Sequence, residues 1–138
     1  MIKVLIVEDE IPAQINLKKL IDKCCDQSRI VMTLSSVRST IKWLQENPEG
    51  ADVIFLDVEL SDGICFEVFE EVEVSAQVII TTAYDNYAIN AFKVNTIDYL
   101  LKPIIESDLK RAWERCKERI SQQSTPNIET LVDMVTKA

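Results

Sequence analysis

Acidic, hydroxyl and lysine side chains stand at the ends of four apolar runs in this chain. Glu8 and Asp9 follow the first run, Asp57 follows the third, Thr82 ends the fourth and Lys102 follows the fifth. Crowded carboxylates repel one another unless a cation lies between them, and an open set of oxygen ligands suits a Mg²⁺ ion that keeps several waters. A lysine and a hydroxyl can then surround the oxygens of a phosphoryl group. The pattern therefore indicates phosphoryl transfer to a carboxylate with the help of Mg²⁺.

Five strand-like segments alternate with helix-like segments, and this alternation would bring those residues together. Strands are expected at residues 2–7, 29–34, 52–56, 77–82 and 97–101. Apolar residues with helical spacing follow each strand, at residues 17–24, 37–44, 65–72, 84–91 and 107–116. Such units predict an α/β fold, a (βα)5 flavodoxin-like doubly wound parallel sheet with strand order 2-1-3-4-5. In these sheets ligands bind beyond the carboxyl ends of the strands, near the point where the strand order reverses.

Composition excludes several other classes of function. The chain has no histidine, so it cannot carry a Ser-His-Asp or Cys-His mechanism or act as a phosphohistidine carrier. Its net charge of −8, from 23 acidic and 15 basic residues, disfavours nucleic-acid binding by this chain. Residues 8–10 read Glu-Asp-Glu where a nucleotide-binding fold would have a glycine-rich loop.

Length, leader and cysteine usage indicate one cytoplasmic domain followed by a tail. The 138 residues suit a single core at residues 1–120, and the start of the chain lacks the features of a secretory leader. The apolar runs are too short to span a membrane. The four cysteines form no zinc-ligand pattern and are expected to be free thiols in a reducing compartment, with the adjacent Cys24 and Cys25 the one pair that merits a redox test.

The tail, residues 121–138, changes character. Residues 121–127 are polar and contain a proline, which is typical of a linker, and residues 128–135 regain helical spacing. We expect a linker and a short amphipathic helix leading to an effector domain that is absent from this chain, although a self-contained tail would have the same pattern.

Four strings carry a resemblance to a known family. The order and spacing of these strings resemble the signature set of response regulator receiver domains: residues 7–10 (VEDE), 55–60 (FLDVEL), 82–83 (TA) and 99–103 (YLLKP). The resemblance extends from residue 1 to about residue 120. The resemblance implies that Glu8 and Asp9 hold Mg²⁺ and that Asp57 accepts a phosphoryl group from the phosphohistidine of a sensor histidine kinase. The backbone carbonyl of Glu59 would complete the ligands that the protein gives to the metal.

The same resemblance assigns the remaining residues of the site. Thr82 would be the switch hydroxyl and Tyr99 the aromatic residue that swings inward on activation. Lys102 would pair with the phosphoryl group, and Pro103 would follow a cis peptide bond.

Residues 82–92 and 97–104 are similar to receivers that are attached to LytTR-type DNA-binding domains. This similarity implies transcription control by the parent protein, with DNA binding only through the absent effector domain. The predicted face formed by the fourth helix, the fifth strand and the fifth helix carries both acidic and basic residues. We therefore expect salt bridges across this face in a homodimer that forms on activation. The residues of this face are Tyr87, Lys93, Asp98, Lys110, Arg111 and Arg115.

Two alternatives belong to other classes. Haloacid dehalogenase-like phosphatases also use a strand-end aspartate with Mg²⁺, but they place a second aspartate two residues later, where this chain has Glu59. Turnover of small phosphate esters would identify such an enzyme. A pseudo-receiver that only mediates dimerisation would lack acyl-phosphate formation, and the full set of phosphorylation residues argues against it.

Overall fold

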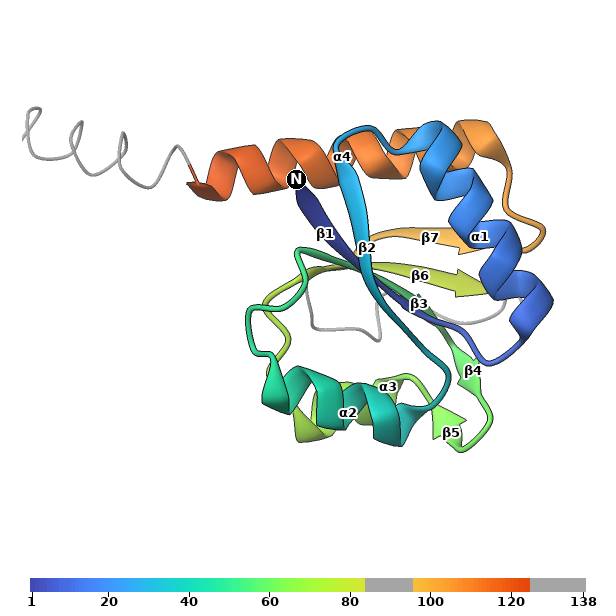
Figure 1. The fold of residues 1–138 in the computed structure, drawn as a ribbon, viewed down its shortest axis with the longest axis vertical. Coiled ribbons are helices and arrows are strands. Elements are labelled where there is room, and N and C mark those ends of the chain that lie inside the picture. The colour runs from blue at the N-terminus through green and yellow to red at the C-terminus, as the bar shows by residue number, and fades with distance from the viewer. Residues whose placement is uncertain (84–95, 125–138) are drawn as a thin grey trace, which may run out of the picture.

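Five parallel strands form the central sheet of the molecule (Figure 1). The computed structural model describes residues 1–83 and 96–124, with side chains described up to residue 121. The strand order is β2-β1-β3-β6-β7, which is the predicted 2-1-3-4-5 order once two short extra strands are set aside. The strands are β1 (Ile2–Val7), β2 (Ser28–Leu34), β3 (Val53–Asp57), β6 (Gln77–Thr82) and β7 (Thr96–Leu101). The flavodoxin-like fold is therefore confirmed.

Helices cover both faces of this sheet (Figure 1). On one side lie α1 (Ile11–Cys24) and α4 (Glu106–Ser124), and on the other lie α2 (Val37–Glu46) and α3 (Phe66–Glu71). Pro12 stands in the first turn of α1, where its missing N–H costs no helical hydrogen bond. Ser36 caps α2, because its hydroxyl accepts a hydrogen bond from the N–H of Ser39 at 3.0 Å.

The alternation of side chains along each strand divides the core in two. In β1, Val4 and Ile6 pack against α1 and α4, whereas Leu5 and Val7 pack against α2 and α3. All four side chains are almost completely buried. This burial on both faces explains why the strands read as nearly continuous apolar runs in the sequence.

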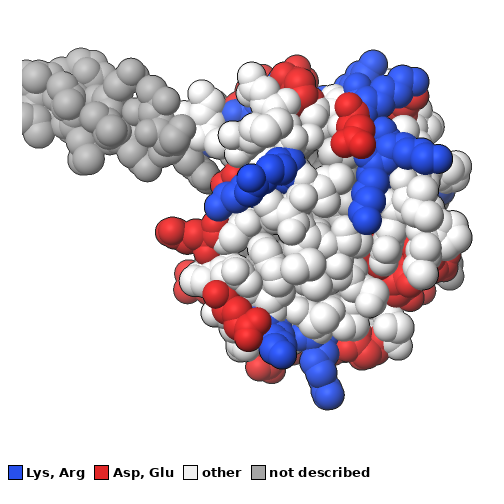
Figure 2. Space-filling view, viewed as in Figure 1, with Lys and Arg blue, Asp and Glu red and all other residues white. Residues whose placement is uncertain are grey.

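The outer strand β2 is less buried than the strands inside the sheet. Met32 in β2 is 38% exposed, and the other residues of the strand are partly buried or exposed. Figure 2 shows mostly uncharged side chains in the centre of the face that carries β2, with charged residues around its rim. An edge strand has one covered side rather than two, which accounts for this difference.

Two features differ from the prediction. A hairpin of β4 (Glu59–Leu60) and β5 (Gly63–Ile64) stands where the sequence indicated a simple turn. The α4 helix continues to Ser124, so the first four residues of the expected linker are helical. Serine and glutamine at 121–124 tolerate a helix, and the first breaker, Pro126, comes later. The helix expected at 84–91 and the segment 128–135 lie outside the described residues.

Two further findings concern the cysteines and the membrane. All four cysteines are free, and burial raises the pKa of Cys25, Cys65 and Cys116 to about 12. These three thiols are therefore poor nucleophiles at neutral pH. No helix within the described part of the chain has the length and apolar character that crossing a bilayer demands.

Candidate functional site

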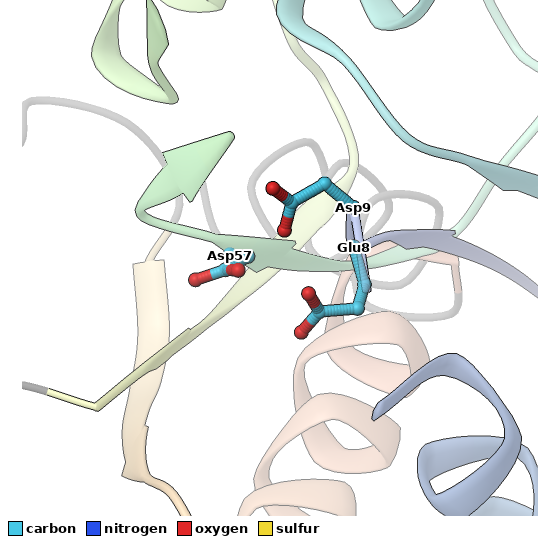
Figure 3. A group of neighbouring side chains, drawn as sticks. All are labelled: Glu8, Asp9 and Asp57. Carbon is cyan, nitrogen blue, oxygen red and sulfur yellow. The ribbon is translucent and has the colours of Figure 1, made fainter. Parts of the chain in front are cut away.

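The carboxyl ends of four neighbouring strands meet at one edge of the sheet and bring the predicted residues together. Glu8 and Asp9 follow β1, Asp57 is the last residue of β3, Thr82 is the last residue of β6 and Lys102 follows β7. Figure 3 shows the carboxylates of Glu8, Asp9 and Asp57 turned toward a common space. One oxygen atom from each of them lies within 4.8 Å of the others. The convergence expected from the sequence is thus present.

The Lys102 ammonium lies between two of these carboxylates. Its Nζ atom is 2.5 Å from Glu8 Oε1 and 3.2 Å from Asp57 Oδ2. The backbone N–H of Lys102 donates to the carbonyl of Thr82 at 2.7 Å, which ties the residue to the end of β6. The backbone of Lys102 is therefore fixed at the end of β6, and its ammonium lies beside Asp57.

Burial dominates the electrostatics of Asp57. Asp57 is only 6% exposed, and desolvation together with the nearby charge of Glu8 raises the pKa of its carboxyl to about 7, although Lys102 acts in the opposite direction. Burial also opposes ionisation of Glu8, but hydrogen bonds from Lys102 and from the N–H of Glu10 bring its pKa below the ordinary value. The pKa of Asp9 is raised by burial and by Glu8. The Lys102 ammonium thus contacts two of the three acidic groups, and a second cation would relieve the repulsion that remains among them.

The donor set fits a hard divalent cation. Carboxylate oxygens are the ligands that Mg²⁺ prefers, and two or three of them with several waters make a typical site for this ion. Asp9 is partly exposed, so water has access to the cluster. Glu8, Asp9 and Asp57 could therefore hold Mg²⁺, which would offset the charge of the carboxylates and of an incoming phosphoryl group.

The other predicted residues lie around this cluster. Thr82 is 1% exposed and Tyr99 is half-buried, packed against the apolar cluster on the side of α2 and α3. Glu59 begins the β4–β5 hairpin two residues after Asp57, and its side chain is exposed. The peptide bond between Lys102 and Pro103 is cis, as expected.

Two contacts near the site were not predicted. The amide of Gln14 in α1 donates from Nε2 to the carbonyl of Glu8 at 2.6 Å, and thereby fixes the backbone that carries the first two carboxylates. Asp62, in the turn of the β4–β5 hairpin, accepts hydrogen bonds from the start of α2. The sequence signal for Asp62 was its place beside Gly63, which indicates a turn but does not reveal a contact with a helix 25 residues earlier.

Comparison with known proteins decides the family. A family profile described as the response regulator receiver domain matches residues 4–114. The chain belongs to the response regulator receiver family. Among curated relatives, the receiver is 32% identical over 126 residues to the sensory transduction protein LytT of Bacillus anthracis, with 89% of this chain and 50% of that protein covered. It is 34% identical over 125 residues to the transcriptional regulatory protein BtsR of Escherichia coli, and the match covers 89% of this chain and 51% of that protein.

Solved structures agree with this assignment. The response regulatory domain of protein mrkE from Klebsiella pneumoniae is 32% identical with a TM-score of 0.73, over 87% of this chain and 98% of that one. A receiver domain from Clostridium thermocellum is 26% identical with a TM-score of 0.74, and the match covers 89% of this chain and 99% of that one. The receiver described here spans about half the length of the curated relatives that it matches.

Proposed function

We propose that this receiver accepts a phosphoryl group on Asp57 from the phosphohistidine of a sensor histidine kinase, in a reaction that needs Mg²⁺. The observation that carries the proposal is the position of Asp57, a buried carboxylate with Glu8 and Asp9 on one side and the Lys102 ammonium 3.2 Å away. An Asp57 oxygen would form a bond to phosphorus while the bond between phosphorus and the histidine nitrogen breaks. The donor must be a partner protein, because this chain has no histidine.

Each neighbouring residue has a separate role in this proposal. Glu8, Asp9 and the backbone carbonyl of Glu59 would hold the metal together with Asp57. Lys102, kept near Asp57 by its hydrogen bond to β6, would pair with a phosphoryl oxygen. The Thr82 hydroxyl would bind another phosphoryl oxygen, and Tyr99 would turn inward as Thr82 moves.

The output of the switch would be control of transcription in the cytoplasm. Two relatives bear names that refer to sensory transduction and transcriptional regulation, and both are about twice the length of the segment that this receiver matches. We propose that an effector domain of the LytTR type, outside this chain, binds the DNA. Phosphorylation would act on it by promoting a homodimer through the face that includes β7 and α4.

Incubation with acetyl phosphate and Mg²⁺ tests the assignment of Asp57. Intact-mass measurement should show the addition of one phosphoryl group to the parent, and Asp57→Asn should remove it, because an amide cannot serve as the nucleophile. Asp22→Asn is a matched control, since Asp22 is an exposed aspartate of α1, away from the strand ends, and it should leave labelling unchanged. Undiminished labelling of Asp57→Asn would exclude Asp57 as the acceptor.

A second assay distinguishes the receiver from a phosphatase. A receiver should form one acyl phosphate per chain and lose it slowly, whereas a phosphatase that uses the same aspartate should turn over small phosphate esters many times. Continuous release of phosphate from such an ester, abolished by Asp57→Asn, would replace the proposed function with an enzymatic one.

A further inference from the structure

The β4–β5 hairpin connects Asp57 to α3, and hydrogen bonds fix its two ends. The N–H of Val58 donates to the Thr81 carbonyl at 3.1 Å, and the N–H of Cys65 donates to the Val58 carbonyl at 2.8 Å. Glu59 pairs with Ile64 and Leu60 pairs with Gly63 in an antiparallel arrangement of two residues on each side. Leu60 is 8% exposed, but Glu59 and Ile64 are exposed at the surface. A hairpin this short is not stable alone in water. Contacts with the rest of the molecule must therefore determine where its backbone lies.

Asp62 provides a polar contact of this kind, directed to the start of α2. Its Oδ1 atom accepts a hydrogen bond from the N–H of Val37 at 2.7 Å, and its Oδ2 atom accepts one from the N–H of Arg38 at 3.0 Å. Figure 1 shows the hairpin beside this end of α2. These N–H groups have no partner inside the helix, and the helix dipole favours a negative charge at this end. Both oxygens of one carboxylate are thus engaged by one helix terminus.

The helix dipole and the hydrogen bonds both favour the ionised form of Asp62. Burial opposes its ionisation, but the N–H groups of Arg38 and Val37 bring the pKa of this carboxyl below its usual value. The carboxylate form therefore persists at neutral pH, and hydrogen bonds that it accepts are charge-assisted.

A second contact holds the other strand of the hairpin. Gly63 has a φ of +155°, and a Cβ atom added there would lie 2.8 Å from both carboxylate oxygens of Glu67 in α3. The N–H of Ile64 donates to Glu67 Oε1 at 3.5 Å, so this strand contacts α3 while Asp62 ties the turn to α2. The residues between these contacts and Asp57 are Val58, Glu59, Leu60 and Ser61.

We infer that Asp62 is a positioning residue for the metal site. By tying the hairpin to α2, it holds the backbone of Glu59 where its carbonyl can serve as a metal ligand. The inference rests on the proposed function, because it concerns the same Mg²⁺ site. It goes beyond that function because it assigns a share in the affinity for the ion to an exposed residue in the turn of the hairpin.

Helix capping alone is the alternative role for Asp62, and the chain offers a matched control for it. Ser36 also caps α2, and within the described part of the chain its hydrogen bonds go to Ser39 and Thr40 of the same helix rather than to the hairpin. Asp62→Ala and Ser36→Ala should each lower the melting temperature by a few degrees, and by similar amounts, because each removes a cap of the same helix. Only Asp62→Ala removes the hydrogen bonds between the hairpin turn and α2.

Isothermal titration calorimetry of Mg²⁺ binding to the unphosphorylated chain tests the inference. We expect Asp62→Ala to raise the Kd about tenfold, the size typical for residues that orient metal ligands. Ser36→Ala should leave the Kd unchanged, and Asp62→Asn, which keeps one carbonyl acceptor, should give an intermediate value.

The possible outcomes separate the two proposals. Absence of Mg²⁺ binding by the parent would overturn the proposed function itself. A parent-like Kd for Asp62→Ala, or an equal loss for Ser36→Ala, would overturn the positioning role and leave the proposed function intact. If Asp62→Ala does not fold, Asp62→Asn decides the question, because a parent-like Kd for that variant would contradict the inference.

Discussion

At the scale of single residues, the environment of Asp57 has a measurable effect on stability. The folded protein raises the pKa of this carboxyl from an ordinary value of 3.8 to about 7, mainly by burial. Between these two values the folded state retains a proton that the unfolded state has lost. The associated stability is complete below pH 3.8 and is lost as the pH rises through 7.

Asp57→Asn should therefore make the metal-free protein more stable at high pH than the parent. The amide carries no charge, so the variant does not incur the cost of ionising a buried carboxyl beside Glu8. We expect an advantage of roughly 1–2 kcal/mol at pH 8 that declines as the pH is lowered toward 4. Thermal unfolding in EDTA at a series of pH values provides the measurement. Parallel profiles for the two proteins would show that Asp57 does not titrate in this range.

At the scale of elements, the strands were predictable and the short connections were not. The five long strands were found within one or two residues, because burial on both faces leaves an unmistakable apolar run such as residues 2–7. The convergence of Glu8, Asp9, Asp57 and Lys102 followed from the same topology. The β4–β5 hairpin escaped prediction because its turn contacts the start of α2, 25 residues earlier in the sequence.

The anchoring of α4 also depends on a distant contact, which leads to a prediction. Trp113 is 1% exposed, and its indole N–H donates to the carbonyl of Asp26 at 3.0 Å. Trp113→Phe leaves that carbonyl without its donor and opens space in the core, so it should lower the free energy of unfolding by about 1–3 kcal/mol. Urea denaturation measures the loss. Trp43→Phe is the control, because Trp43 is only partly buried, and an equal loss in both variants would contradict the role of the Asp26 bond.

At the scale of the whole molecule, the charged face proposed for dimerisation already has ion pairs within one chain. Asp98 lies 3.5 Å from Arg111 Nε and 3.4 Å from Arg115 Nη1. Tyr87 and Lys93, the other predicted members that precede β7, lie outside the described residues. Salt links across a dimer would therefore require Asp98 to exchange or share its partners.

Sedimentation velocity with and without beryllofluoride, a mimic of the phosphoryl group, tests this dimer. We expect the mass of the parent to approach twice that of the monomer when beryllofluoride and Mg²⁺ are added. Arg111→Ala should weaken the association, because it removes one of the two cations beside Asp98. A parent mass that stays constant at micromolar concentrations would contradict activation through dimerisation.

The length of α4 gives the molecule a mechanical property. The helix starts four residues after Lys102 and runs without a break through 19 residues, which is about 28 Å at the usual rise of 1.5 Å per residue. In Figure 1 its far end extends past the edge of the sheet. A rigid rod turns a small tilt at its base into a larger displacement at its tip, and a tilt of about 10° over this length moves the tip by about 5 Å. A small tilt of α4 at the end near Lys102 would therefore become a larger movement at the far end of the helix.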